Sequence, residues 1–498
     1  MLFLSKLPSR LQKSVQTLTA LCLLIGLGAC GGGDNTQLVE GGIGGTGISV
    51  GSITGFGSIY QNGIRYDVSQ ANFYRDGQPV NDETAFRIGE VVTITGNRSA
   101  NTLAQGQAER VEFNTTLQGV ITQAPSSNTL NILQQAVRIN GRTVLHGIQQ
   151  LNELQTGQVV TLSGERDANG TINATSLSLQ ANQFLSGSST HIVQGFVSDH
   201  HNVQQTFQLG KLTIDYSRVS LAQALNKGDY VRVYSQRPLR QNTLLADRIR
   251  LQQATPNFAT GTEVELEGFI TRFIRSDRFN VSGQAVQTNS HTEYEHGTAA
   301  DLQLNAAVEV EGKIDANGVL QAEEIAIRQG DNAEELELEG FIEAIDDDKQ
   351  TLHVLGNTLF VDGDSILLDE RHDNERSIKL SELRSQDYVE VDIAQLNDGT
   401  LLVLKLERKN ENGQEAESEI EGTVESIDKV AQTLKVLNIA ITTDVNTQFF
   451  HKDDTVLTRQ DFFATVTPQN RVEVEGHPLD SDNTWLLADT ITLKTEDD

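Results

Sequence analysis

The segment Val308-Glu309-Val310-Glu311-Gly312 alternates apolar and acidic side chains, the pattern of a β-strand with one buried face. The same five residue types return at Val472-Glu473-Val474-Glu475-Gly476. Four related segments lie elsewhere in the chain, at Val91–Gly96, Val159–Gly164, Tyr230–Val233 and Val389–Val391. This strand therefore belongs to a unit that the chain repeats six times.

Two further signatures accompany this strand. A glycine followed by apolar residues precedes each copy, at Gly51, Gly119, Gly195, Gly268, Gly340 and Gly422. The motif Ala-x-x-apolar-x-apolar follows five of the six copies, beginning at Ala108, Ala174, Ala246, Ala322 and Ala488, whereas the fifth copy has Leu401–Leu406 instead. Three signatures in one order indicate tandem repeats.

Within a repeat the apolar residues have a period of two, so the repeat is built of strands. Turn segments such as Asp315-Ala316-Asn317-Gly318 contain Asn-Gly, which favours a β-hairpin. Five strands, with a helical turn between the third and fourth (Asp301–Leu304 in the fourth repeat), are the order of an OB-type barrel.

We therefore predict an all-β fold, a tandem array of six small five-stranded OB-like β-barrels, each with a short helical turn between strands 3 and 4. We expect each barrel to contact only the next one. A set of open sandwiches has the same strand count and is the alternative. The predicted segments are a signal peptide (1–29), a Gly-rich tether (30–50) and repeats at 51–113, 115–180, 191–252, 262–329, 334–409 and 417–494.

The N-terminus has the features of an export signal. A positively charged start precedes the apolar run Leu21–Leu27, which is too short to span a bilayer. Small residues before Cys30 and glycines after it resemble a bacterial lipoprotein signal. That resemblance implies a lipidated Cys30 that anchors the chain to the membrane, and Gly31 favours the outer membrane. An ordinary secretory signal with an incidental cysteine is the alternative.

Composition excludes several classes of function. The 498 residues include 68 acidic and 38 basic ones, a net charge of −30, so we expect no nucleic acid partner. Two cysteines, Cys22 and Cys30, are too few for a disulfide framework or a thiolate metal cluster. Gly42–Gly47 matches G-x-G-x-x-G, but no strand precedes it and no helix follows, so we interpret it as tether.

Charge divides the chain into two halves. Residues 51–250 carry 14 acidic and 16 basic residues, and residues 251–498 carry 52 acidic and 19 basic ones. In the third repeat, alternation places Arg232, Arg248 and Arg250 on the outer face of two strands. This strip is a candidate site for an anionic glycan or lipid headgroup. An ordinary solvated face, or one that pairs with acidic repeats, is the alternative.

The acidic half contains candidate cation ligands. Asp346-Asp347-Asp348 and Asp362-Gly363-Asp364 place carboxylates close together, as weak calcium sites do. Their spacing is not that of a dedicated calcium loop, and Asp346–Asp348 falls where a hairpin turn is expected. Apart from weakly bound calcium, we expect no cofactor.

Catalytic motifs are scarce. Asp199-His200-His201 suits acid–base chemistry, and His291, Glu293 and Glu295 lie on one strand face as zinc ligands do. The first matches a turn in the second repeat, and the second has no visible supporting residues. The sequence has no H-E-x-x-H or P-loop motif, so we do not expect an enzyme.

The stretch Gly51-Ser52-Ile53-Thr54-Gly55-Phe56-Gly57-Ser58-Ile59-Tyr60 resembles a repeated bacterial domain of envelope lipoproteins, domain of unknown function 5666. The resemblance extends over residues 41–494 and is most specific in the first repeat. It implies tandem barrels on an exported, lipid-anchored chain and implies no reaction. We therefore expect a non-enzymatic protein that binds or scaffolds an envelope polysaccharide or envelope protein. An acidic, cation-gathering spacer is the alternative.

Overall fold

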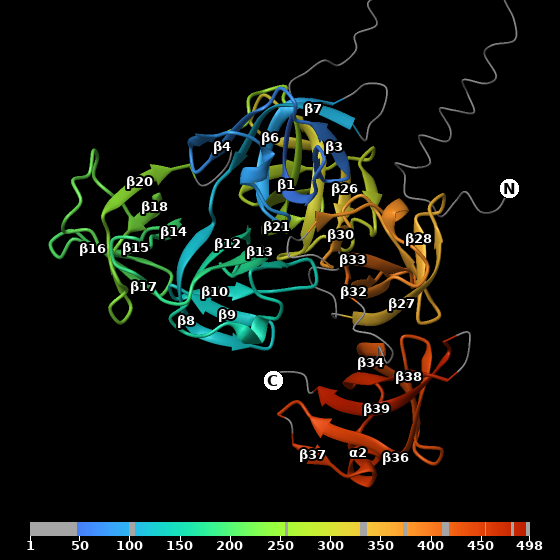
Figure 1. Ribbon diagram of the computed structural model, residues 1–498. Coiled ribbons are helices and arrows are strands. Elements are labelled where there is room, and N and C mark those ends of the chain that lie inside the picture. The colour runs from blue at the N-terminus through green and yellow to red at the C-terminus, as the bar shows by residue number, and fades with distance from the viewer. Residues whose placement is uncertain are drawn as a thin grey trace, which may run out of the picture.

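The computed structural model describes residues 47–98, 105–253, 257–328, 336–371, 376–410, 418–453, 455–479 and 483–494. Strands are the dominant regular structure of this part of the chain, and it forms six repeats of the same strand order (Figure 1). None of its helices is long and apolar enough to cross a bilayer. The predicted signal peptide, with Cys30, lies outside the described residues.

Repeat 2 shows how the barrel closes. Its elements are β8 (Leu117–Ser126), β9 (Thr129–Ile132), β10 (Gln135–Arg138), β11 (Val144–His146), the 3₁₀ helix η3 (Leu151–Glu153), β12 (Val159–Arg166) and β13 (Ile172–Ala181). β8 pairs antiparallel with β9 and β12, and β13 pairs antiparallel with β12. β13 also pairs in parallel with β10 and β11, which together form an interrupted third strand. The ring is therefore that of an OB-type barrel, as predicted.

Four other repeats have the same ring. Repeat 1 comprises β1 (Gly47–Gly55), β2 (Ile59–Gln61), β3 (Ile64–Asp67), β4 (Asn72–Arg75), β5 (Gln78–Val80), η2 (Glu83–Ala85), β6 (Val91–Arg98) and β7 (Gln105–Phe113). Repeat 4 comprises β21 (Glu263–Arg275), β22 (Arg278–Val281), β23 (Gln284–Gln287), β24 (Glu293–Glu295), β25 (Ala307–Ile314) and β26 (Leu320–Ile327). Repeat 5 comprises β27 (Leu336–Asp346), β28 (Thr351–Val354), β29 (Asn357–Phe360), β30 (Ile366–Asp369), β31 (Arg376–Ser377), η5 (Leu380–Glu382), β32 (Tyr388–Gln395) and β33 (Leu401–Arg408). Repeat 6 comprises β34 (Ser418–Asp428), β35 (Thr433–Val436), β36 (Ile439–His451), β37 (Val456–Leu457), α2 (Arg459–Thr465), β38 (Arg471–Pro478) and β39 (Trp485–Lys494).

Repeat 3 departs from this pattern. Its strands are β14 (His191–Phe196), β15 (Ser198–His201), β16 (Thr206–Leu209), β17 (Leu212–Asp215), β18 (Tyr230–Ser235), β19 (Thr243–Leu245) and β20 (Arg248–Gln252). Breaks between β14 and β15 and between β19 and β20 divide its strands between two sheets.

The helical turn between strands 3 and 4 is present in repeats 1, 2, 5 and 6. In the described links of repeats 3 and 4, turns take its place, so the helix expected at Asp301–Leu304 is wrong. The Asp301 carboxylate accepts hydrogen bonds from Thr298 N and Oγ1, at 2.8 and 2.9 Å. These bonds hold the chain in a turn instead of a helix.

The glycine that ends the Val-x-Val-x-Gly signature lies at a bulge. A Cβ atom on Gly164 would lie 2.1 Å from the carbonyl oxygen of Asn173 on the neighbouring strand. Gly96, Gly312 and Gly476 have the same close cross-strand carbonyl. The register of each fourth and fifth strand shifts at this glycine. The repeated glycine thus permits the bend that closes each barrel.

The repeats do not form the predicted array of nearest neighbours. β1 pairs in parallel with β21, joining repeat 1 to repeat 4, and β27 pairs antiparallel with β34, joining repeats 5 and 6. Repeats 2 and 3 meet at Ile192 and Gln118. Each joint uses the free edge of a first strand before its glycine. β1 begins at Gly47, inside the predicted tether, because Ile48–Val50 supply this edge in repeat 1.

Candidate functional site

Two rows of carboxylates cross the joint between repeats 5 and 6. Where β27 pairs with β34, Glu337 lies opposite Glu421, and Glu339 lies opposite Glu419. The outer strands of the joint extend both rows, with Asp392 and Glu390 on β32 and Glu473 and Glu475 on β38. Like charges directly opposite one another on a sheet are destabilising, so this acidic ladder is costly for the fold.

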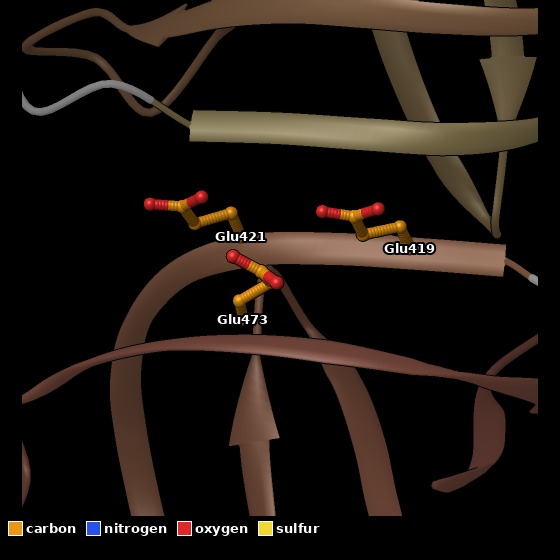
Figure 2. A group of neighbouring side chains, drawn as sticks. All are labelled: Glu419, Glu421 and Glu473. Carbon is orange, nitrogen blue, oxygen red and sulfur yellow. The ribbon is translucent and has the colours of Figure 1, made fainter. Parts of the chain in front are cut away.

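Three members of the acidic ladder converge. Carboxylate oxygens of Glu419, Glu421 and Glu473 lie within 4.8 Å of one another, and Figure 2 shows Glu419 and Glu421 on one strand with Glu473 beside them. Burial, and then the charge of Glu473, raises the pKa of Glu419 to about 8. Burial, and then the charge of Asp392, raises the pKa of Glu337 well above its usual value. The centre of the ladder therefore holds protons near neutral pH.

Basic side chains neutralise some members of the ladder, both inner and outer. Arg471 Nε lies 2.6 Å from Glu421 Oε1, and Lys409 Nζ lies 3.0 Å from Glu390 Oε2. Among the residues that the structure describes, no basic side chain lies within 4.0 Å of a carboxylate oxygen of Glu337 or Glu419. Two of the three converging carboxylates, Glu421 and Glu473, also pair with Lys494. Carboxylate oxygens are the ligands that hard cations such as calcium prefer, and Glu419 presents such oxygens beside this group.

The joint between repeats 1 and 4 shows the contrast. Glu267 there is buried, and its carboxylate accepts hydrogen bonds from Ser52 N at 2.9 Å and Arg328 Nη1 at 2.6 Å. Glu265 accepts from Ser49 Oγ at 2.9 Å and pairs with Arg98 at 3.2 Å. Neutral and basic partners satisfy the acidic rows in this joint, whereas acidic rows meet each other in the joint of repeats 5 and 6.

The predicted aspartates do not join the acidic ladder. Asp346 receives hydrogen bonds from Lys349 in the turn after β27, which is the hairpin-turn alternative, and Asp347 and Asp348 belong to the same turn. Asp362 accepts from Asp364 N and Ser365 Oγ in the turn before β30. Among the described residues these aspartates form no group of three converging carboxylates.

The predicted arginine strip contains two exposed residues instead of three. Arg232 is only 1% exposed, because its guanidinium forms an ion pair with Asp76 of repeat 1 and a 3.4 Å hydrogen bond with Gln194. Arg248 and Arg250 are exposed on β20, and the Arg248 guanidinium lies 3.9 Å from the centre of the Tyr234 ring. Arg232 therefore joins two repeats and does not line an open surface.

The histidine candidates have local partners. His200 Nε2 lies 2.8 Å from the Tyr216 hydroxyl, and His201 Nε2 lies 3.4 Å from Asp199. His291 contacts the side chain of Asn289, within its own turn. Neither group belongs to a set of three converging ligands among the described residues.

Repeats 1, 2, 4 and 5 meet around a polar cavity of about 20 Å³, the size of one water molecule. Ser52, Glu165, Glu267 and Asp364 line it, one from each repeat. Burial, and then the charge of Glu267, raises the pKa of Glu165 to about 7, although Ser282 donates a 3.1 Å hydrogen bond to its carboxylate. This four-repeat junction was not predicted, because its residues come from distant parts of the chain.

A family model described as Domain of unknown function (DUF5666) matches residues 118–178, 267–326, 339–407 and 421–491, more than half of the chain. The chain belongs to this family. The four DUF5666 matches fall on repeats 2, 4, 5 and 6, so the expectation that repeat 1 is the most specific member is not met.

No curated protein matches this DUF5666 chain. A solved structure, drosophila Unr CSD456, is similar at 13% sequence identity and a TM-score of 0.12, over 59% of this chain and 97% of that chain. A TM-score of this size carries no argument about fold or function.

Proposed function

We propose that this DUF5666 protein is a non-enzymatic scaffold of the bacterial envelope, held to the outer membrane through a lipidated Cys30, where it binds envelope components. The four-repeat junction carries this proposal. Repeats 1, 2, 4 and 5 each contribute a polar residue to one small cavity, so they act as one body instead of as separate modules on a string.

Contacts around the junction support a rigid body. The Arg142 guanidinium of repeat 2 donates a 3.2 Å hydrogen bond to the Asp364 carbonyl oxygen of repeat 5. Ile88 of repeat 1, Val144 of repeat 2 and Ile366 of repeat 5 form a separate apolar cluster. A rigid body with several outward faces can hold partners at fixed distances, which is the physical requirement of a scaffold.

The anchor is tested by fractionation of cells that express the full chain. With Cys30→Ser we expect the protein to move from the membrane fraction to the soluble fraction, and with Cys22→Ser we expect it to stay. A Cys30→Ser protein that remains in the membrane contradicts the anchor.

Binding of envelope components is tested by co-sedimentation with peptidoglycan and with lipopolysaccharide. We expect saturable binding to one of them, and binding to neither contradicts this part of the proposal.

The acidic ladder favours a second candidate function, a spacer that gathers cations. Its carboxylates face one another across the joint between repeats 5 and 6, and three of them converge on the repeat 6 side, so a divalent cation would relieve their repulsion and stabilise the native chain. Scanning calorimetry with and without calcium tests this. We expect calcium to raise the unfolding temperature of the native chain by several degrees and to have little effect on the Glu419→Gln, Glu421→Gln variant. An equal shift in both proteins contradicts the candidate.

A further inference from the structure

In five repeats the last strand of the barrel has a partner along both edges. One edge pairs with the fourth strand, and the second half of the third strand pairs in parallel with the other edge. The pairs are β4 with β7, β11 with β13, β24 with β26, β30 with β33 and the end of β36 with β39. This second half-strand closes the seam of each barrel.

Repeat 3 has no such half-strand. Its link from Tyr216 to Asp229 is described throughout and contains only turns and irregular segments. Among the described strands, β20 consequently pairs with β18 alone and ends the sheet to which it belongs. Figure 1 shows β20 beside β18 at the edge of repeat 3.

The open seam leaves apolar side chains uncovered. Leu251 on β20 is 37% exposed, whereas the residues at the same motif position in repeats 1, 4 and 6, Phe113, Ile327 and Leu493, are at most 5% exposed. Ile249 is half-buried, whereas Val111 at the same position of repeat 1 is fully buried. A free strand edge beside uncovered apolar residues is a template for strand addition.

The charge of this edge is positive. Arg248 and Arg250 are exposed, and among the described residues neither has a carboxylate within 4.0 Å. Their guanidinium groups lie 3.9 and 5.8 Å from the centre of the Tyr234 ring, so one aromatic ring orients both. The edge therefore suits a partner that carries negative charge.

We propose that the free edge of β20 binds an extended acidic peptide as an added parallel strand. The peptide places an apolar residue opposite Ile249 and an acidic residue opposite each of Arg248 and Arg250. Repeat 4 contains the pattern in its own seam, where Glu293-Tyr294-Glu295 pairs with Glu324-Ile325-Ala326. Counted from Ala322 and Ala246, which begin the same motif, those three positions correspond to Arg248, Ile249 and Arg250.

A second copy of this chain is a less suitable occupant. Two copies of β20 could pair antiparallel with Arg250 at the centre, which would place the two Arg250 side chains directly opposite each other. With Ile249 at the centre, Arg248 of each copy would lie opposite Arg250 of the other. Like charges at directly opposite positions oppose pairing.

The site rests on the geometry of repeat 3 and does not require the membrane anchor, so it goes beyond the proposed scaffold.

Fluorescence anisotropy with the purified full-length protein in detergent tests the proposal. The probe is a labelled peptide of residues 290–297, Ser-His-Thr-Glu-Tyr-Glu-His-Gly, and the control peptide has lysine at both glutamate positions. We expect saturable binding of the first peptide only, weakened about tenfold or more by Arg248→Glu with Arg250→Glu. Arg240→Glu, an exposed charge reversal in the hairpin after β18, should leave binding unchanged.

Three results would overturn the proposal: no saturable binding of the acidic peptide, equal binding of the lysine peptide, or equal binding by the double variant. Circular dichroism of both variants checks that repeat 3 still folds. Sedimentation of the native chain addresses the other occupant, since a dimer that Arg248→Glu with Arg250→Glu dissociates would assign the edge to a second copy instead. A peptide with proline in place of tyrosine should not bind, because proline breaks strand pairing.

Discussion

Arg328 Nη1 lies 2.6 Å from Glu267 Oε1, and both side chains are buried where repeat 4 meets repeat 1. The same carboxylate accepts hydrogen bonds from the backbone and the hydroxyl group of Ser52, at 2.9 and 3.2 Å. One buried charge therefore joins two barrels that are far apart in the sequence.

Replacing Glu267 tests this joint. Glu267→Gln removes the charge that balances Arg328, and loss of one partner of a buried ion pair costs about 3 to 5 kcal/mol. Urea unfolding should show this loss as a clearly lower midpoint. The control is Asp346→Asn in the exposed pair with Lys349, where we expect a change of about 1 kcal/mol or less. Equal effects of the two substitutions would contradict the role of Glu267.

Protonation of the acidic ladder predicts a pH dependence. Because the folded pKa of Glu419, about 8, lies above its usual value of 4.5, its contribution to stability is fully present below about pH 4.5. That contribution is lost as the pH rises through about 8. Glu419→Gln should therefore raise the unfolding temperature at pH 9 and have little effect at pH 5.

Glu425→Gln is the control for this pH dependence, since Glu425 pairs with Lys435 on the exposed side of repeat 6. We expect its effect to be small at both pH values. A Glu419→Gln effect that is the same at pH 5 and pH 9 would show that the carboxyl group does not titrate as described.

The arginines of repeat 3 should differ sharply in their effect on stability. Arg232→Met removes the ion pair with Asp76 from a buried position, and we expect a loss of about 3 kcal/mol in the free energy of unfolding. Arg248→Met changes an exposed side chain, and we expect a change within about 0.5 kcal/mol. Chemical denaturation of both variants decides this, and comparable losses would mean that Arg232 is not a structural link.

Gly89 tests the contact between repeats 1 and 2. It has a φ of +79°, and a Cβ atom there would lie 2.2 Å from the Thr175 carbonyl oxygen. Gly157 has a φ of +94°, and a Cβ atom added to it would have no neighbouring atom within 4 Å, so Gly157→Ala reports the backbone strain alone. Gly89→Ala should lower the urea midpoint by more than Gly157→Ala, because it adds a clash between repeats to that strain.

The barrel itself could be predicted because its information is local. Alternation in Val308–Gly312 sets which face points into the barrel, and Asn317-Gly318 sets the hairpin that follows. The alternation does not report that Glu309 on the opposite face is also buried. The order of strands in five of the repeats then follows from the three signatures that each repeat contains in the same order. The prediction of a helical turn in repeat 4 was wrong because a hydrogen bond between Thr298 and Asp301 holds this segment in a turn. The pattern of apolar residues does not report such a bond.

The contacts between repeats could not be predicted in this way. Arg232 has the outward direction that alternation requires, yet its partner Asp76 lies in another repeat. The acidic ladder depends on the register between β27 and β34, which places Glu337 opposite Glu421. The alternation of glutamate in both strands was visible in the sequence, but nothing in either strand identifies the other as its neighbour.

The pairing of β1 with β21 constrains how the molecule assembles. Ser49 and Glu265, joined by a 2.9 Å hydrogen bond, are separated by 216 residues. A chain emerges from the ribosome with its N-terminus first. The edge of β1 therefore has no β21 to pair with until repeat 4 has been synthesised. The six repeats therefore do not finish folding one after another in sequence order. The contact between repeats 1 and 4 closes a long loop, so we expect its formation to be slow.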